Sequence, residues 1–401
     1  MSWVSGHSRS RASVTWAAAR WAAAKLTGRG SALRQADWLL ISVVLALTLL
    51  GTLLIWSATQ PMLIQQGANP HTYLLKQLLN IALGLAFLVV VSSLDVRQLR
   101  LYAPVLYGLS CLGLLAVLTP FGTIVNGARS WISIGAGFQV EPSEFAKLAV
   151  IVISAMLLSD LRGGERPGAK AVAKTVGIAA IPIALVAAEP DLGVMIVLVL
   201  LVAGLIALSG VRLRWLAGMA VGAVLAVTAV AKLHLLKAYQ VRRLASFINP
   251  SADPRGTGYS AAQAKIAIGS GGLHGTGLFH SSLIAGSFVP EQHTDFIFAV
   301  VGNELGFVGS MIIIGLLALL LLCALRTATR AEDQFGMLVA AGIAIWFAAQ
   351  SFVNIGMTMG IMPVTGLPLP FVSYGGSAMF ADMIAVGLLL SVRRPRNVFA
   401  S

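Results

Sequence analysis

Charged residues are scarce in this sequence. Asp, Glu, Lys and Arg together make up 11% of the 401 residues, whereas 57% are hydrophobic. A soluble domain carries about 25% charged residues, so this composition excludes an ordinary soluble protein and predicts an integral membrane protein. Cysteine is also rare, with 2 residues, Cys111 and Cys323, each inside an apolar stretch. No disulfide framework or cysteine-based metal motif can therefore be read from the sequence.

Long apolar runs dominate the chain instead. A transmembrane helix needs about 20 largely apolar residues, and we therefore predict an all-α integral membrane protein with about ten transmembrane helices. We expect residues 1–35 to form a basic cytoplasmic tail, 36–396 the membrane domain and 397–401 a C-terminal tail. The predicted spans are residues 38–58, 74–93, 102–119, 142–159, 171–188, 190–209, 216–236, 296–325, 336–359 and 377–392.

Acidic residues are outnumbered, with 15 Asp and Glu against 28 Lys and Arg. If the N-terminus lies inside, most Lys and Arg fall in cytoplasmic segments, as the positive-inside rule requires. An even number of spans then places both termini in the cytoplasm, in a multi-pass protein of the cytoplasmic (inner) membrane. The basic excess is thus explained by membrane orientation, and we expect no nucleic-acid partner.

One long polar segment, residues 237–295, interrupts the apolar runs on the predicted outer face. It is far longer than the usual connection of about 4–6 residues, and long loops on a rigid scaffold often carry function. Its glycine cluster, Gly269–Gly277, lacks the Lys-Ser/Thr ending of a nucleotide-binding P-loop. Two interpretations stay open for this cluster: close backbone packing, or backbone N–H groups near a phosphate.

The long loop ends in the sequence PEQHTDF, Pro290–Phe296, at the mouth of a predicted span. A carboxylate placed there, Asp295, is a candidate general base, and His293 is a candidate switch or ligand. Thr294 or Asp295 could instead cap the following helix, which is worth about 1 kcal/mol. Glu304, further along the same predicted span and on nearly the opposite helix face, is expected to support packing.

A second polar motif, EPSEFAK, opens the predicted span at 142–159. Glu144 and Lys147 are three residues apart and can share one helix face. Ionisable residues inside a span are candidates for a functional site, and a purely structural Glu144–Lys147 pair is the alternative. Upstream, Arg129 could bind a phosphate, and Trp131 could anchor the chain at the membrane interface.

Two further outer segments have mainly structural signals. In AEPDLG, Pro190 and Asp191 are a standard turn and helix start, and this structural role is favoured. The segment Met362–Ala378 is rich in Pro and Gly and carries no charge. Such irregular backbone persists at membrane depth only when it is buried in protein or lines a cavity. Asp382 follows it inside the last span, and the sequence names no partner for it.

Together these segments resemble the SEDS family (shape, elongation, division and sporulation) of bacterial peptidoglycan polymerases. Two motifs, IAIGSGGLHGTG and IMPVTGLPLPFVSYGGS, are more similar to the elongation branch (RodA) than to the division branch (FtsW). The chain departs from the family pattern at Glu141, where Gln is usual, and at Asn303, where Glu is usual. The resemblance extends over roughly residues 36–396 through NGARSWI, EPSEFAK, EPDLG, NPSADPRGTGYSAAQAKIAIGSGG, FVPEQHTDFIFAV and MPVTGLPLPFVSYGGS.

The resemblance implies a glycosyltransferase that joins lipid II units into glycan strands on the outer face of the membrane during cell elongation. Asp295 matches the catalytic Asp of the family, and Glu144 and Lys147 match its conserved Glu and Lys. A class B penicillin-binding protein is implied as the transpeptidase partner. Other implied partners are elongation-complex membrane proteins and membrane lipids.

The expected mechanism is an inverting transfer in which Asp295 is the general base on the acceptor 4-hydroxyl. The leaving diphosphate needs positive charge, which a divalent cation, Mg²⁺ or Mn²⁺, could also supply. Two other functions stay open, a lipid II flippase and a non-catalytic scaffold for a cell-wall synthase, as does the division role. The candidate catalytic residues are Asp295, Lys147 and Glu144, and the candidate substrate-binding residues are Arg129, Arg242, Arg243, Lys265, His293 and Trp131.

Overall fold

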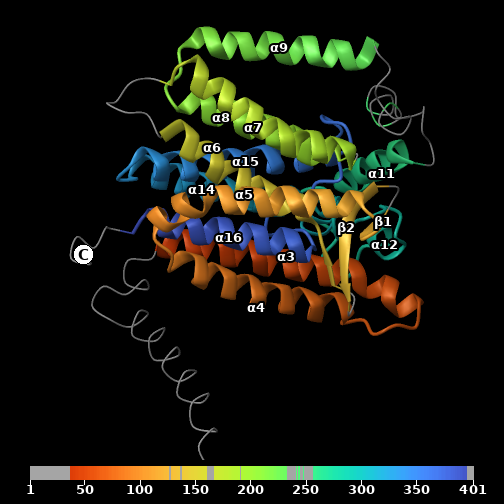
Figure 1. The fold of residues 1–401 in the computed structure, drawn as a ribbon. Coiled ribbons are helices and arrows are strands. Elements are labelled where there is room, and N and C mark those ends of the chain that lie inside the picture. The colour runs from red at the N-terminus through yellow and green to blue at the C-terminus, as the bar shows by residue number, and fades with distance from the viewer. Residues whose placement is uncertain are drawn as a thin grey trace, which may run out of the picture.

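The computed structural model describes residues 37–125, 128–135, 138–159, 167–189, 191–232, 241, 243, 247 and 256–394. Most of these residues form helices that lie side by side in one bundle (Figure 1). The helices are α3 (Trp38–Gln65), α4 (Thr72–Ser92), α5 (Val96–Leu118), α6 (Pro142–Ser159), α7 (Ala169–Ala188), α8 (Leu192–Leu208), α9 (Leu213–Lys232), α11 (Thr257–Ser270), α12 (Ser282–Ala285), α13 (Ile297–Glu304), α14 (Gly306–Thr329), α15 (Gln334–Met359) and α16 (Gly376–Val392). The strands are β1 (Gly122–Val125), β2 (Ala128–Gly135) and β3 (Phe138–Val140).

The long helices coincide with the predicted spans. Among the described residues, 7 helices are long and apolar enough to cross a membrane, namely α3, α4, α5, α6, α7, α14 and α15. Helices α8 and α16 are apolar but shorter, with 17 residues each. Helix α9 covers the remaining predicted span, 216–236, in large part. The helical multi-pass fold predicted from the sequence is therefore confirmed.

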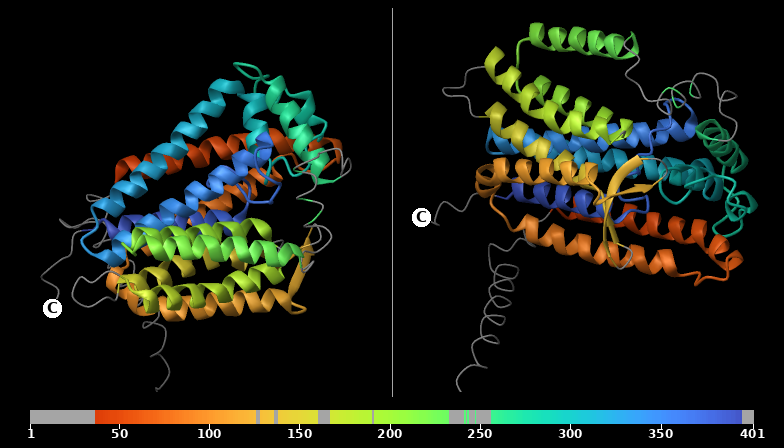
Figure 2. Two further views of the ribbon diagram at one scale, coloured as in Figure 1. Left: turned by 90° about the horizontal axis from the view of Figure 1, so that it is seen from above. Right: turned by 45° about the vertical axis from the view of Figure 1, so that its right-hand side comes forward.

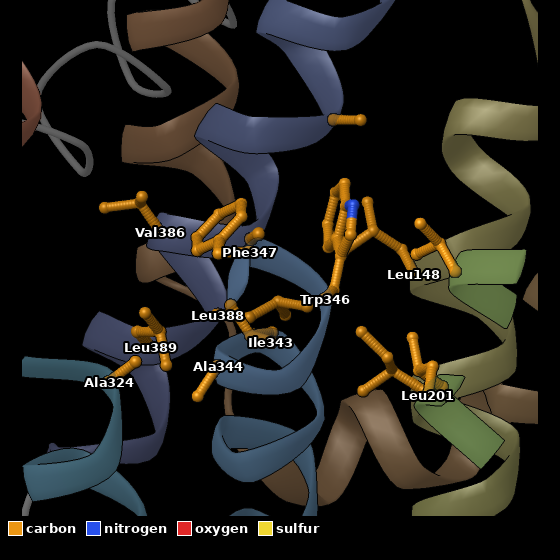
Figure 3. Packing of buried hydrophobic residues seen from close by; sticks show 14 of the residues in the cluster. Leu148, Leu201, Ala324, Ile343, Ala344, Trp346, Phe347, Val386, Leu388 and Leu389 are labelled. Atoms are coloured by element: carbon orange, nitrogen blue, oxygen red, sulfur yellow. The ribbon is translucent and has the colours of Figure 1, made fainter. Parts of the chain in front are cut away.

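Helices α6 and α15 form the centre of the bundle. In each of them 78% of the most apolar window is buried, against 17% to 28% in α4, α5 and α7. Figure 3 shows two neighbouring α15 side chains, Trp346 on the side of Leu148 of α6 and Phe347 on the side of Val386 of α16. Helices α4, α5 and α7 expose most of their apolar surface, as expected for helices that face lipid. Polar groups on α6 and α15 are therefore enclosed by protein.

A small antiparallel sheet precedes α6, in the order β1–β2–β3. Thr123 of β1 pairs with Trp131 of β2, and Ser133 of β2 pairs with Gln139 of β3. Only helices were expected from the sequence, so the all-α prediction is incomplete here. The run of aromatic and β-branched residues at Trp131, Ile132 and Ile134 is typical of a strand. Its signal is weak beside the long apolar runs on either side.

The predicted span at 296–325 is wrong as a continuous helix, because it breaks at Leu305 into α13 and α14. Gly306 follows the break with φ +66°. A Cβ atom on Gly306 would lie 2.3 Å from the backbone nitrogen of Gly275. Only glycine therefore permits both the backbone conformation and the close approach at this position.

The glycine cluster at 269–277 packs directly against this break. The N–H groups of Thr276 and Gly277 each donate to a carbonyl of α13, those of Asn303 and Glu304, both at 3.0 Å. In return, two N–H groups of α14, at 307 and 308, donate to the carbonyls at 272 and 273. The close-packing interpretation of the cluster is confirmed. The loop satisfies the backbone groups that the broken helix leaves open.

The two ends of the bundle differ in character. The sheet, α11 and α12 gather at one end in all three views (Figures 1 and 2). The helix ends away from the sheet carry a set of basic residues, as the positive-inside rule expects for a cytoplasmic face. The described members of this set are Arg97, Arg100, Lys170, Lys174, Arg212, Arg214, Arg326, Arg330, Arg393 and Arg394.

Candidate active site

Asp295 lies at the end of the bundle that holds the sheet, in the segment before α13. The helix begins at Ile297, its N-cap position is Phe296, and no side chain caps it. The capping interpretation of Thr294 and Asp295 is therefore wrong. The hydroxyl of Thr294 instead donates to the carbonyl of Glu291 at 3.2 Å. The carboxylate of Asp295 is left half-buried and is not used to start a helix.

Hydrogen bonds hold the backbone around Asp295 at three consecutive carbonyl groups. Asn354 Nδ2 donates to the Asp295 carbonyl at 2.8 Å, and Ser373 Oγ donates to the Thr294 carbonyl at 2.7 Å. The Tyr374 N–H donates to the His293 carbonyl at 2.9 Å. The donors come from α15 and from the segment between α15 and α16. Because the backbone is fixed from two directions, the position of the carboxylate is defined.

Electrostatics bring the pKa of Asp295 close to neutral pH. Burial raises the pKa of this carboxyl to about 7, the negative charges of Glu291 and Asp191 add to the rise, and Arg243 opposes it. Gly366, at φ +81°, lies against the carboxylate, since a Cβ atom there would be 3.4 Å from Asp295 Oδ2. A carboxylate with a pKa near the working pH is suited to accept a proton in catalysis.

Glu144 and Lys147 form a buried ion pair on α6. Lys147 Nζ lies 2.7 Å from Glu144 Oε1 and also donates to Gln350 Oε1 at 2.7 Å. The same ammonium lies 4.7 Å from the ring centre of Trp346, within range of a cation–π interaction. Lys147 is 0% exposed, and Glu144 Oε2 has no hydrogen-bond partner among the described residues. The pair predicted from the i, i+3 spacing is therefore present.

Asp191 and Arg243 act electrostatically on Asp295, and Asp191 is also acted on by Glu144 and Lys147. Asp191 caps α8 through a hydrogen bond of 3.0 Å from the Val194 N–H to Oδ1, so its predicted structural role is confirmed. Burial raises the pKa of Asp191, and Glu144, Lys147 and Arg243 are among the charges that act on it. Because Asp191 and Arg243 also act on Asp295, the structure brings Asp295, Lys147 and Glu144 into one polar region.

His293 packs against two tyrosine rings, which also contact each other at 5.1 Å between ring centres. Its ring centre lies 4.8 Å from that of Tyr73 on α4 and 5.7 Å from that of Tyr374. Burial lowers the pKa of His293, and Glu291 opposes this change. The neutral imidazole is therefore favoured at pH 7, in a position that braces the segment preceding Asp295.

The remaining substrate-binding candidates contact other parts of the chain. Arg129 on β2 donates to the Thr119 carbonyl at 3.4 Å, and Trp131 lies half-buried on the same strand. Lys265 is exposed on α11 and approaches Gly360, where a Cβ atom would lie 3.2 Å from its Nζ. Arg242 and Pro190 lie outside the described residues. In the part of the chain that the structure describes, neither Arg129, Trp131 nor Lys265 has a hydrogen bond to Asp295.

Two other acids, Asp382 and Glu304, have structural partners. Asp382 Oδ2 accepts a hydrogen bond of 3.1 Å from the Phe371 N–H, which supplies the partner that the sequence could not name. Glu304 Oε1 accepts from Ser57 Oγ on α3 at 2.7 Å, so its predicted packing role is confirmed. Within the described ranges, no three His, Cys, Asp or Glu side chains come close enough together to hold a metal ion.

Two residues of this region, Gln350 and Asn354 on α15, were not predicted from the sequence. Both are fully buried, and their amides bond to Lys147 and to the carbonyl of Asp295 respectively. A signal existed, because two amides at i and i+4 in an otherwise apolar span share one helix face. That pattern alone does not say which groups the amides meet.

Curated relatives match this sequence along most of their length. The sequence is 38% identical to "Peptidoglycan glycosyltransferase MrdB" of Escherichia coli over 91% of this chain and 95% of the relative. It is also 38% identical to "Probable peptidoglycan glycosyltransferase FtsW" of Acinetobacter baylyi over 88% of each chain.

Solved structures agree with these relatives. A chain of a structure titled "Structural coordination of polymerization and crosslinking by a peptidoglycan synthase complex" matches with TM-score 0.73 and 31% identity, over 89% of this chain and 97% of that one. The rod shape determining protein RodA of Thermus thermophilus matches with TM-score 0.66 and 30% identity, over 90% and 97%. The family model FTSW_RODA_SPOVE, described as "Cell cycle protein", matches residues 37–398. The chain therefore belongs to the FtsW/RodA/SpoVE family, the SEDS family that its motifs resemble.

Proposed function

We propose that this protein is an inverting peptidoglycan glycosyltransferase that polymerises lipid II during cell elongation, with Asp295 as the general base. Family membership and the 38% identity to the Escherichia coli glycosyltransferase support the activity. The observation that carries the role of Asp295 is its carboxylate, half-buried, free of any capping task and with a pKa of about 7. It lies in the region that also contains the Glu144–Lys147 pair.

The reaction requires one proton transfer and one displacement. The 4-hydroxyl oxygen of the acceptor sugar attacks the anomeric carbon of the donor, and a C–O bond forms as the bond to the lipid diphosphate breaks. Asp295 takes the hydroxyl proton during this attack. The leaving diphosphate keeps the bonding electrons, and a single displacement inverts the configuration at the donor carbon.

Positive charge is needed where the diphosphate leaves. Among the described residues, Arg243 is the strongest candidate, because its charge acts on both Asp295 and Asp191. Lys147 is fully buried and already bonded to Glu144 and Gln350. It therefore stabilises the diphosphate through its positive electrostatic potential and not by direct contact. Arg129 and Lys265 are candidates at the rim, and Arg242 is a further one beside Arg243.

We also propose that a divalent cation, Mg²⁺ or Mn²⁺, binds together with the diphosphate. The described residues offer no cage of three metal-binding side chains. Mg²⁺ is commonly held by one or two carboxylates together with substrate phosphates, and Asp191 would serve in that way while Asp295 takes the proton. The cation would neutralise charge on the leaving diphosphate.

The protein is a multi-pass protein of the inner membrane, as its apolar helices and its family indicate. We place the end that holds Asp295 on the outer side and both termini in the cytoplasm, because the basic helix ends lie at the opposite end of the bundle. Lipid tails of the substrate would then lie along apolar helix surfaces, while its sugars reach Asp295.

We also propose a class B penicillin-binding protein as the transpeptidase partner, with other elongation-complex membrane proteins and membrane lipids around it. Support comes from the structural match to a chain of a complex that coordinates polymerization and crosslinking. A division role is the second candidate, because an FtsW relative is also 38% identical. The match to a rod shape determining protein favours elongation.

Purified protein with labelled lipid II tests the activity. Wild type should form glycan strands that are resolved on a gel, and Asp295→Ala should form none. The exposed acid Glu332 lies between α14 and α15, away from the sheet, so Glu332→Ala is the matched control and should retain activity. Unchanged polymer from Asp295→Ala would sink the assignment. Lipid transfer across proteoliposomes without polymer would instead identify a flippase.

A further inference from the structure

Two buried amides on α15 lie between Lys147 and Asp295. Gln350 and Asn354 are each 0% exposed. They are four residues apart on one helix and therefore lie on the same face. A buried amide is costly unless its polar atoms are bonded, so the partners of these two side chains are informative.

The orientation of the Gln350 amide is fixed by its partners. Oε1 accepts from Lys147 Nζ at 2.7 Å and from Trp346 Nε1 at 2.6 Å, while Nε2 donates to the Pro368 carbonyl at 2.9 Å. The Lys ammonium and the Trp indole only donate, and a backbone carbonyl only accepts. No flipped amide satisfies all three bonds. Gln350 therefore links the ammonium of Lys147 to the backbone at Pro368.

Asn354 is fixed in the same way. Its Nδ2 donates to the Asp295 carbonyl at 2.8 Å and to the Leu367 carbonyl at 2.7 Å. Both partners are acceptors, so only the amide nitrogen can face them. Asn354 therefore links the backbone at Asp295 to the backbone at Leu367.

The two linked carbonyls are neighbours in the chain and belong to a support strip, residues 365–368. Three other groups of the site rest on this strip. Arg243 donates to the Thr365 carbonyl at 3.3 Å, and Gly366 lies against the Asp295 carboxylate. The first turn of α8 packs closely on the strip at Gly193, where a Cβ atom would lie 2.7 Å from Leu367 Cγ. Arg243 and Asp295 therefore contact the support strip directly, and Lys147 is connected to it through Gln350.

We propose that Gln350 and Asn354 are positioning residues for glycosyl transfer, which hold the ammonium of Lys147 and the carboxylate of Asp295 in register through the support strip. The inference rests on the proposed function of Asp295. Neither amide is exposed to substrate, so both act through the groups that they hold. A misplacement of about 1 Å at a reacting group can cost about 100-fold in rate.

The substitutions separate the individual bonds. Asn354→Ala removes both donors, and kcat is expected to fall roughly 10- to 100-fold with little change in KM. Gln350→Glu keeps acceptors for Lys147 and Trp346, whereas Gln350→Leu removes every polar bond, so Gln350→Glu should retain more activity. Gln77 on α4 is the matched control, because it is also 0% exposed and its amide atoms have no hydrogen-bond partner among the described residues. Gln77→Leu should leave kcat unchanged.

A readout besides activity keeps the inference testable if a variant is inactive. Hydrogen exchange of the full-length protein should rise at residues 293–296 in Asn354→Ala and stay unchanged there in Gln77→Leu. Unchanged exchange together with wild-type kcat in Asn354→Ala would overturn the inference. Wild-type polymerisation by Asp295→Ala would instead refute the proposed function, so the two failures are distinguishable.

Discussion

Lys147→Met removes a positive charge from the centre of the protein and keeps a side chain of similar length. Glu144 is then left as a buried charge without its partner at 2.7 Å. Breaking a buried pair in this way costs about 3–5 kcal/mol. Gln350 Oε1 keeps its bond from Trp346 Nε1 at 2.6 Å, so the loss is assigned chiefly to Glu144. We therefore expect a loss of this size in the free energy of unfolding.

A second substitution tests the cause. In Lys147→Met combined with Glu144→Gln, no unpaired charge is left, and replacing a whole buried pair by uncharged groups is often close to neutral. The double variant should therefore recover most of the lost stability. Unfolding in mixed micelles with increasing SDS measures all three proteins. A single variant within about 1 kcal/mol of wild type, or a double variant less stable than the single one, would contradict the pairing.

Three further predictions use other parts of the structure. Gly306→Ala should destabilise the protein by about 1–3 kcal/mol, because φ is +66° and the Cβ atom would lie 2.3 Å from Gly275 N. Gly177→Ala is the control, because a Cβ atom there would meet nothing within 4 Å. Equal stability of the two variants would refute this account. Burial raises the pKa of Glu189 to about 8, so the stability that it contributes is complete below its ordinary pKa and is lost as pH rises through about 8. Glu189→Gln should therefore reduce the fall in the free energy of unfolding between roughly pH 5 and 8. The same fall in the variant as in wild type would contradict a raised pKa for this carboxyl. Because the pKa of Asp295 is raised to about 7, the rate of polymerisation should rise with pH through about 7 as the base loses its proton, and a rate that is flat from about pH 5 to 8 would exclude this role.

Much of the membrane fold follows from the sequence. Apolar runs of sufficient length define the helices, and the basic residues at one set of helix ends define an orientation. The Glu144–Lys147 pair follows as well, because the i, i+3 spacing on a helix brings the two side chains together without any other element.

Features that depend on a distant partner could not be predicted in this way. The break at Leu305 needs the loop at 271–277 to receive its backbone groups, and an apolar run does not show this loop. The hydrogen bond of Asp382 comes from the Phe371 N–H. Phe371 has φ 63°, a backbone conformation that the sequence around it does not predict. The roles of Gln350 and Asn354 depend on carbonyls that only the folded segment at 365–368 presents.

The measurement that tests the central claim most directly is polymerisation of labelled lipid II by purified Asp295→Asn. This substitution keeps the size of the side chain and the backbone hydrogen bonds at residues 293–295, but it removes the group that accepts the proton. We predict an inserted, folded protein whose stability is close to wild type and whose glycan strands are absent from the gel. Strands formed at the wild-type rate would contradict the assignment of Asp295 as the general base.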